Sequence, residues 1–112
     1  MTTTDIQEPP EHLPKDFQLY QNYPNPFNPS TTLSFVIGQS SFVSLKVYDM
    51  LGNEVATLVD EYKPAGKYEV EFNADSHSGK VRSAKGGLPS GVYFYQLQSG
   101  DFISTKSMVM IK

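Results

Sequence analysis

The sequence has 112 residues, a length that suits one domain. Seven Tyr and seven Phe argue against a disordered chain, because disordered segments are poor in large apolar side chains. A net charge of −3 without a lysine cluster excludes a typical nucleic-acid partner, and the lack of cysteine excludes disulfides, iron–sulfur clusters and thiol nucleophiles. No apolar run is long enough to cross a membrane, so we expect no membrane insertion.

Residues 1–16 differ in composition from the rest of the chain. They hold three of the eight prolines, four acids and almost no apolar periodicity, which predicts a flexible linker rich in Pro and acids. They lack the basic and apolar stretches of a signal peptide. We therefore expect the folded domain to occupy residues 17–112.

From Phe17 onward, short segments rich in β-branched and aromatic residues are separated by turn formers. Between Thr31 and Ile37, one predicted face holds Leu33, Phe35 and Ile37, and the other holds Thr32, Ser34 and Val36. The same period of two places Val43, Leu45 and Val47, and then Tyr68, Val70 and Phe72, on inward faces. The predicted strands are Phe17–Tyr20, Thr31–Ile37, Phe42–Asp49, Glu54–Val59, Lys67–Phe72, Val92–Gln98 and Phe102–Ile111.

Turn signals separate these strands. Three prolines exclude Pro24–Pro29 from a central strand or a helix interior. Turns are expected at Met50–Asn53 and Pro64–Lys67, a polar loop at Asn73–Ser90, and a hairpin at Ser99–Asp101. About seven short strands of period two predict an all-β fold, an immunoglobulin-like antiparallel β-sandwich; an up-and-down barrel is the alternative that suits seven strands less well.

Several segments resemble one family in order and spacing. They are Tyr23–Thr32, Leu45–Asp49 followed by Leu51–Val55, Pro64–Gly66, Leu88–Leu97, and the ending Lys106–Lys112. The family is that of the type A C-terminal sorting domains of the type IX secretion system in Bacteroidetes-like bacteria. The motif residues are Pro24, Asn25, Pro26, Phe27, Asn28, Pro29, Gly52, Gly91 and Tyr93. One departure is the loop Ala74–Gly87, which is longer and more basic than is usual in the family.

The resemblance implies a non-enzymatic secretion and sorting signal, an immunoglobulin-like module that follows a larger exported cargo protein. It implies transit through the periplasm and recognition by the outer-membrane translocon and its shuttle proteins. The resemblance further implies that a sortase-like transpeptidase at the cell surface removes the domain, which leaves the cargo at the surface or releases it into the extracellular space. The Pro-rich segment could either cap a sheet edge or contact the translocon directly, and the two roles are compatible.

The last predicted strand is the candidate recognition signal. Four apolar residues run almost to the chain end, bracketed by lysines; the candidate residues are Lys106, Met108, Val109, Met110, Ile111 and Lys112. A last strand at a sheet edge would offer unpaired backbone groups that a receptor reads by strand addition. The alternative is a docked strand with no role in recognition.

Other chemistry finds little support in the sequence. His12 lies in the Pro-rich tail and His77 in a polar loop, and neither has an acid and a nucleophile at the spacing that a catalytic triad needs. Asp75–Gly79 lacks the repeated carboxylates of a calcium loop. We expect no catalytic activity, metal or cofactor. Two alternative functions are a structural immunoglobulin-like module, as in flagellar hook-capping proteins, and a carbohydrate-binding module. The latter requires Tyr93 and Tyr95 to be exposed, whereas Gly91–Tyr95 is predicted to lie in the core.

Overall fold

The computed structural model describes residues 16–75 and 88–111. The predicted linker, apart from Asp16, the basic part of the long loop and Lys112 lie outside the described residues. All seven predicted strands are present: β1 Gln18–Leu19, β2 Ser30–Ile37, β3 Ser41–Tyr48, β4 Glu54–Lys63, β5 Gly66–Asn73, β6 Gly91–Ser99 and β7 Phe102–Met110.

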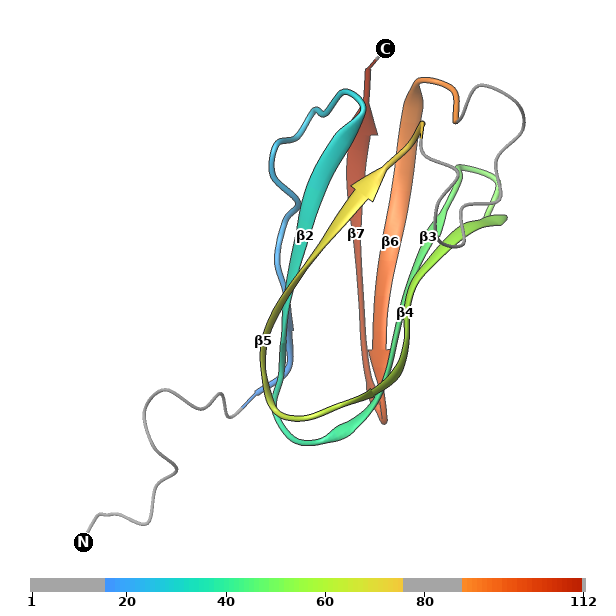
Figure 1. Cartoon of the computed structure of the whole chain (residues 1–112). Coiled ribbons are helices and arrows are strands. Elements are labelled where there is room, and N and C mark those ends of the chain that lie inside the picture. The colour runs from blue at the N-terminus through green and yellow to red at the C-terminus, as the bar shows by residue number, and fades with distance from the viewer. Residues whose placement is uncertain (1–15, 76–87, 112) are drawn as a thin grey trace, which may run out of the picture.

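The strands form two antiparallel sheets that face each other (Figure 1). One sheet has the order β1-β2-β5, and the other has the order β4-β3-β6-β7. The chain enters at the lower end of the sandwich in Figure 1 and leaves at the upper end. This arrangement confirms the predicted all-β, immunoglobulin-like sandwich.

Alternating apolar residues build the core between the sheets. Leu33, Phe35 and Ile37 of β2 are fully buried, and so are Val43, Leu45 and Val47 of β3. The period-two interpretation of these strands is therefore confirmed. Val36, predicted on the polar face, is also buried. It lies between Gln18 and Lys67 in the register, and long side chains such as these can cover an apolar neighbour.

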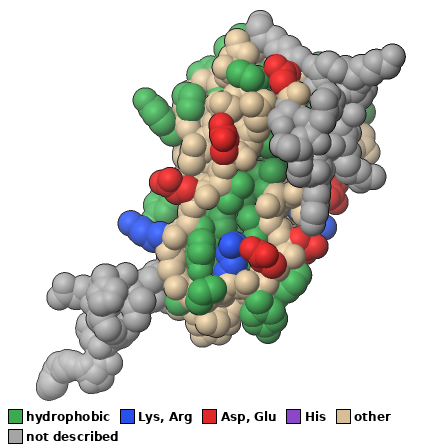
Figure 2. Space-filling view, viewed as in Figure 1, with side chains coloured by type: hydrophobic (Ala, Val, Ile, Leu, Met, Phe, Trp, Pro, Cys, Tyr) green, Lys and Arg blue, Asp and Glu red, His purple; other side chains and the backbone are tan. Residues whose placement is uncertain are grey.

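The inward face of β5 is less buried than its pattern predicts. Phe72 is buried, but Tyr68 and Val70 are only half-buried because β5 is an edge strand with β2 as its one strand partner. Figure 2 shows hydrophobic side chains at the surface between the two sheets on this side. The ring of Tyr68 stacks on Phe35, 5.5 Å between centroids, and Lys63 Nζ lies 4.7 Å from the Tyr68 centroid.

Strand β4 extends four residues beyond its predicted end at Val59. Its last residues pair with the start of β3, with Tyr62 opposite Phe42 and Lys63 opposite Ser41. The rings of Phe42 and Tyr62 meet edge to face, 6.0 Å between centroids. The polar run Asp60–Glu61 hides this extension in the sequence, because the pairing depends on β3 and not on local alternation.

Candidate functional site

The terminal strand β7 is an edge strand whose side chains divide between the core and the solvent. Met108 and Met110 are buried in the core, and Lys106 lies on the same face, half-buried. Val109 lies on the opposite face and is half-buried, whereas Ile111, just beyond the strand, is 51% exposed. Of the candidate recognition residues that the structure describes, the two methionines therefore build the fold, and Ile111 is the most accessible.

The Pro-rich segment lies along the outer edge of β7. The main-chain N–H of Phe27 donates to Val109 O (2.9 Å), and the N–H of Ile111 donates to Phe27 O (2.9 Å). The N–H of Val109 donates to Asn25 Oδ1 (3.0 Å). Further along the same edge, Gln21 Nε2 donates to Ser107 O (2.7 Å). Two motifs that lie far apart in the sequence thus form one surface.

This contact changes the expected mode of recognition. The sequence analysis treats the last strand as an edge with unpaired backbone groups, but the chain's own segment occupies the outward groups of Val109 and the amide of Ile111. Strand addition by a receptor at these positions would first require displacement of Asn25–Phe27. The segment caps the sheet edge, as one of the two sequence interpretations proposes.

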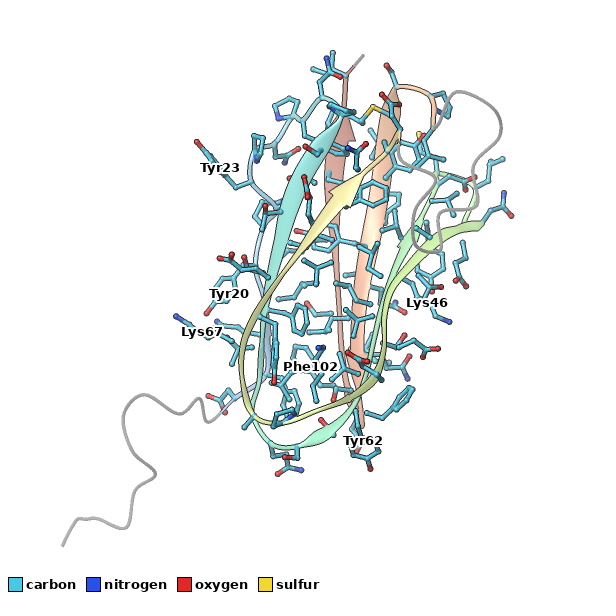
Figure 3. All side chains as sticks on the ribbon, viewed as in Figure 1. Tyr20, Tyr23, Lys46, Tyr62, Lys67 and Phe102 are labelled. Atoms are coloured by element: carbon cyan, nitrogen blue, oxygen red, sulfur yellow. The ribbon has the colours of Figure 1, made fainter. Side chains whose placement is uncertain are left out.

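Phe27 anchors the Pro-rich segment in the core. Its side chain is buried and meets the ring of Phe72 edge to face, 6.1 Å between centroids. The neighbouring motif residues Pro24, Asn25, Pro26 and Asn28 are exposed, and Pro29 is half-buried. Figure 3 shows Tyr23, just before this motif, pointing away from the molecule. The motif therefore combines one buried anchor with an exposed polar and Pro-rich face.

A buried hydrogen-bond network fixes the entry to this segment. The hydroxyl of Tyr95 donates to Tyr20 O (2.7 Å) and accepts from the N–H of Asn22 (2.8 Å). Asn22 Nδ2 donates to Pro24 O and to Thr31 Oγ1, each at 3.0 Å. Asn22 and Thr31 are both 2% exposed. Sequence reasoning missed this pair. Asn22 is a polar residue beside a Pro-rich segment, which is typical of a solvated loop. Thr31 lies two residues before the inward-facing Leu33, and this spacing is the signal that could have found it.

Burial raises the pKa of Tyr95 to about 12, and the hydrogen bond from the Asn22 amide opposes that rise. Burial, followed by the charge of Asp49, also raises the pKa of Tyr93. The Tyr93 hydroxyl donates to Pro89 O (2.6 Å). Because Tyr93 and Tyr95 are 4% and 0% exposed, the aromatic pair that a carbohydrate-binding module would need here is buried.

The turn between β3 and β4 is held by the side chain of Asp49. Its Oδ1 accepts from the main-chain N–H groups of Leu51 and Asn53, each at 2.9 Å. These hydrogen bonds, the one from the Asn53 amide first, hold the pKa of Asp49 below its usual value. Gly52 has φ +89, a conformation that side chains with a Cβ rarely adopt, which explains the glycine in this motif.

Among residues 16–75 and 88–111, no group of three or more His, Asp or Glu side chains could hold a metal ion. His12 and His77 lie outside the described residues. No described segment forms a helix long and apolar enough to cross a membrane.

The domain is an immunoglobulin-like β module: a seven-stranded sandwich whose Pro-rich motif is hydrogen-bonded to its last strand. The chain belongs to the family of secretion system C-terminal sorting domains, whose sequence model matches residues 21–112. This match confirms the resemblance to type IX sorting domains, and with it the identity of the domain as a secretion signal for export from the cell. No curated protein matches the sequence.

Two solved structures share the fold. PorZ, a surface component of the type IX secretion system of Porphyromonas gingivalis, matches with a TM-score of 0.55 and 22% identity over 84% of this chain and 11% of its own. Dimeric latent PorU from Porphyromonas gingivalis matches with a TM-score of 0.55 and 19% identity over 85% of this chain and 9% of its own. The present chain thus spans about a tenth of each protein, and at these identities the likeness is one of fold.

Proposed function

We propose that the domain directs a larger exported protein through the outer membrane, and that the type IX translocon and its shuttle proteins recognise it there. The family match to residues 21–112 carries this proposal. The contact of Asn25–Phe27 with β7 supports it, since two family motifs converge on one surface. Residues 1–16 are the linker that joins the domain to the cargo protein in this proposal.

The same proposal describes how the domain is transported and then removed. The fusion passes through the periplasm, a sortase-like transpeptidase removes the sorting domain, and the cargo is left at the cell surface or released. The domain itself contributes no chemical step. Its role is to present a folded surface to the export machinery, and the buried core between its two sheets holds that surface in place.

The exposed groups at the upper end of β7 are the part of the terminal motif that a receptor can reach. Ile111 is exposed, Val109 is half-buried on the outer face, and Asn25 is exposed beside them. Met108 and Met110 act indirectly, because their burial fixes the position of the strand end. Lys106 and Lys112 supply the charges of the proposed signal.

The test fuses all 112 residues to the C-terminus of a periplasmic reporter in a host that has a type IX secretion system. We expect the reporter at the cell surface, and in the periplasm when the same fusion is made in a translocon-deficient strain. Mass spectrometry of the delivered reporter then shows whether the domain was removed. A folded fusion that stays in the periplasm of the competent host would contradict the proposal and favour a structural immunoglobulin-like module.

A further inference from the structure

Two apolar side chains stand exposed at the tip of the β3–β4 turn. Met50 is 70% exposed and Leu51 is 86% exposed, the largest value among the exposed large hydrophobic residues that the structure describes. Side chains as exposed as these bury only a small part of their apolar surface on folding, so they add little to the free energy of folding. The fold therefore does not account for an apolar pair at this position.

The turn holds this pair rigidly. The Asp49 carboxylate binds the amide of Leu51 directly, and the N–H of Gly52 donates to Asp49 O (3.1 Å). The N–H of Asp49 in turn donates to Asn53 O (2.9 Å), which closes the turn at its base. A loose loop could fold its apolar side chains back onto the protein, but this turn keeps them in solvent. Such preorganisation lowers the entropic cost of binding a partner.

A shallow groove joins the tip to the end of the sandwich where the terminal strand finishes. The groove has a volume of about 200 Å³ and is lined by Asp49, Met50, Leu51, Ser90, Gly91, Val92 and Tyr93. Gly91 pairs with Met110, and Met110 in turn is bridged to Phe27. The turn, the start of β6, the end of β7 and the Pro-rich segment thus follow one another across the upper end of the molecule (Figure 1).

This end points away from the place where the cargo would join. Phe17, near the start of the described chain, stacks on Phe102 at the first residue of β7, 5.5 Å between centroids. Figure 3 shows Phe102 at the lower end of the sandwich. Met110 lies eight residues further along the strand, a span of about 27 Å at the usual rise per residue. A receptor at the upper end would therefore meet no obstruction from the cargo.

We propose that Met50 and Leu51 are anchor residues that insert into an apolar pocket of the export receptor, with the adjoining groove forming the rest of the contact. The proposal rests on the sorting function above and adds recognition residues that lie outside the terminal strand. A few residues that fill a desolvated pocket typically carry most of the binding energy of an interface. Met is enriched at interfaces, and Leu51 adds apolar area beside it. A second copy of the chain is a poorer occupant, because two side chains cannot supply the roughly 1,200 Å² that a stable dimer buries.

The test measures surface delivery of the reporter fusion with Leu51→Asn, Met50→Gln and both together, beside the thermal midpoint of each variant. Because both side chains are exposed, we expect unchanged midpoints and a loss of delivery of about tenfold or more in the double variant. Leu51→Met keeps the apolar character and is expected to deliver like the parent. Ile103→Thr is the matched control: Ile103 is 56% exposed beside Phe102 at the opposite end of β7, and its loss should leave delivery unchanged.

Three outcomes would overturn the inference. The first is delivery by the double variant at the level of the parent. The second is a loss of delivery by Ile103→Thr as large as that by Leu51→Asn, which would indicate a general effect of surface hydrophobicity. The third is a parent that sediments as a dimer and that Leu51→Asn converts to a monomer. If the parent fusion itself stays in the periplasm, the sorting function fails before the anchors are tested, so the two failures are distinguishable.

Discussion

The main-chain amide of Phe27 donates a 2.9 Å hydrogen bond to the carbonyl oxygen of Val109, which ties the Pro-rich motif to the terminal strand. Because the Phe27 side chain is also buried against Phe72, the segment is held by packing and by hydrogen bonds at once. The chain itself satisfies these backbone groups at the edge of β7, so a signal at this end, as we propose, would consist of exposed side chains.

Phe27→Ala should destabilise the domain by about 3–5 kcal/mol, because it leaves a cavity beside Phe72 and loosens the cover of β7. Denaturant unfolding measures this change. Asn28→Ala is the matched control in the same segment; its side chain is exposed, and we expect a change within about 0.5 kcal/mol. Equal stability of the two variants would show that Phe27 does not anchor the segment.

Tyr95 makes the stability of the domain sensitive to alkaline pH. Its folded pKa of about 12 lies above the ordinary value of 10.0, so the unfolded chain loses the phenolic proton first. The protonated hydroxyl of Tyr95 therefore stabilises the folded state fully below pH 10, and this stabilisation is lost between pH 10 and 12. At about 1.4 kcal/mol per pKa unit, the loss in the free energy of unfolding is about 3 kcal/mol. Thermal midpoints measured across this window test the sign. A midpoint that does not fall would contradict it.

Tyr95→Phe separates the titration from the packing. At neutral pH the variant should lose about 1–3 kcal/mol, because the amide of Asn22 and the carbonyl of Tyr20 lose a buried partner. Above pH 10 its stability should fall less steeply than that of the parent. The fall that is left belongs in part to Tyr93, whose pKa burial also raises. Parallel pH curves for parent and variant would rule out Tyr95 as the titrating group.

Asp49 should titrate below the ordinary aspartate value of 3.8, because the amides of Asn53, Leu51 and Gly52 favour its charged form. The charged carboxylate of Asp49 therefore stabilises the folded state at pH values above the ordinary aspartate pKa. This stabilisation is lost as the pH falls through the lower pKa of the folded state. NMR titration of the side-chain carboxyl measures the shift directly. Asn53→Ala removes one side-chain donor and should move the pKa partway up; an unchanged value would mean that this donor is not engaged.

Lys106→Ala and Lys112→Ala test whether the bracketing lysines belong to the export signal. We expect each variant to melt like the parent, because Lys106 is only half-buried and because a lone charge outside the core contributes little to stability. We expect both to deliver less reporter to the cell surface. Normal delivery by both variants would remove the lysines from the signal, whereas a lowered midpoint would assign them to folding.

The sequence by itself determined the number and approximate position of the strands, and which faces of β2 and β3 point inward. Leu33, Phe35 and Leu45 recur at every second position, and this alternation is a local property that each strand expresses before it meets a partner. The family motifs were equally local. The prolines of Pro24–Pro29 mark a crossover because proline fixes φ and lacks an N–H donor. Gly52 marks a turn because glycine adopts positive φ without steric strain.

Only the tertiary structure decided what these elements meet. The extension of β4 to Lys63 depends on pairing with β3, and the half-burial of Tyr68 depends on β5 lying at a sheet edge. The bond between Phe27 and Val109 and the buried hydroxyl of Tyr95 join residues more than seventy positions apart. No periodicity along the chain encodes such partners, because their energy comes from burial and hydrogen bonding that exist only after the two sheets have packed.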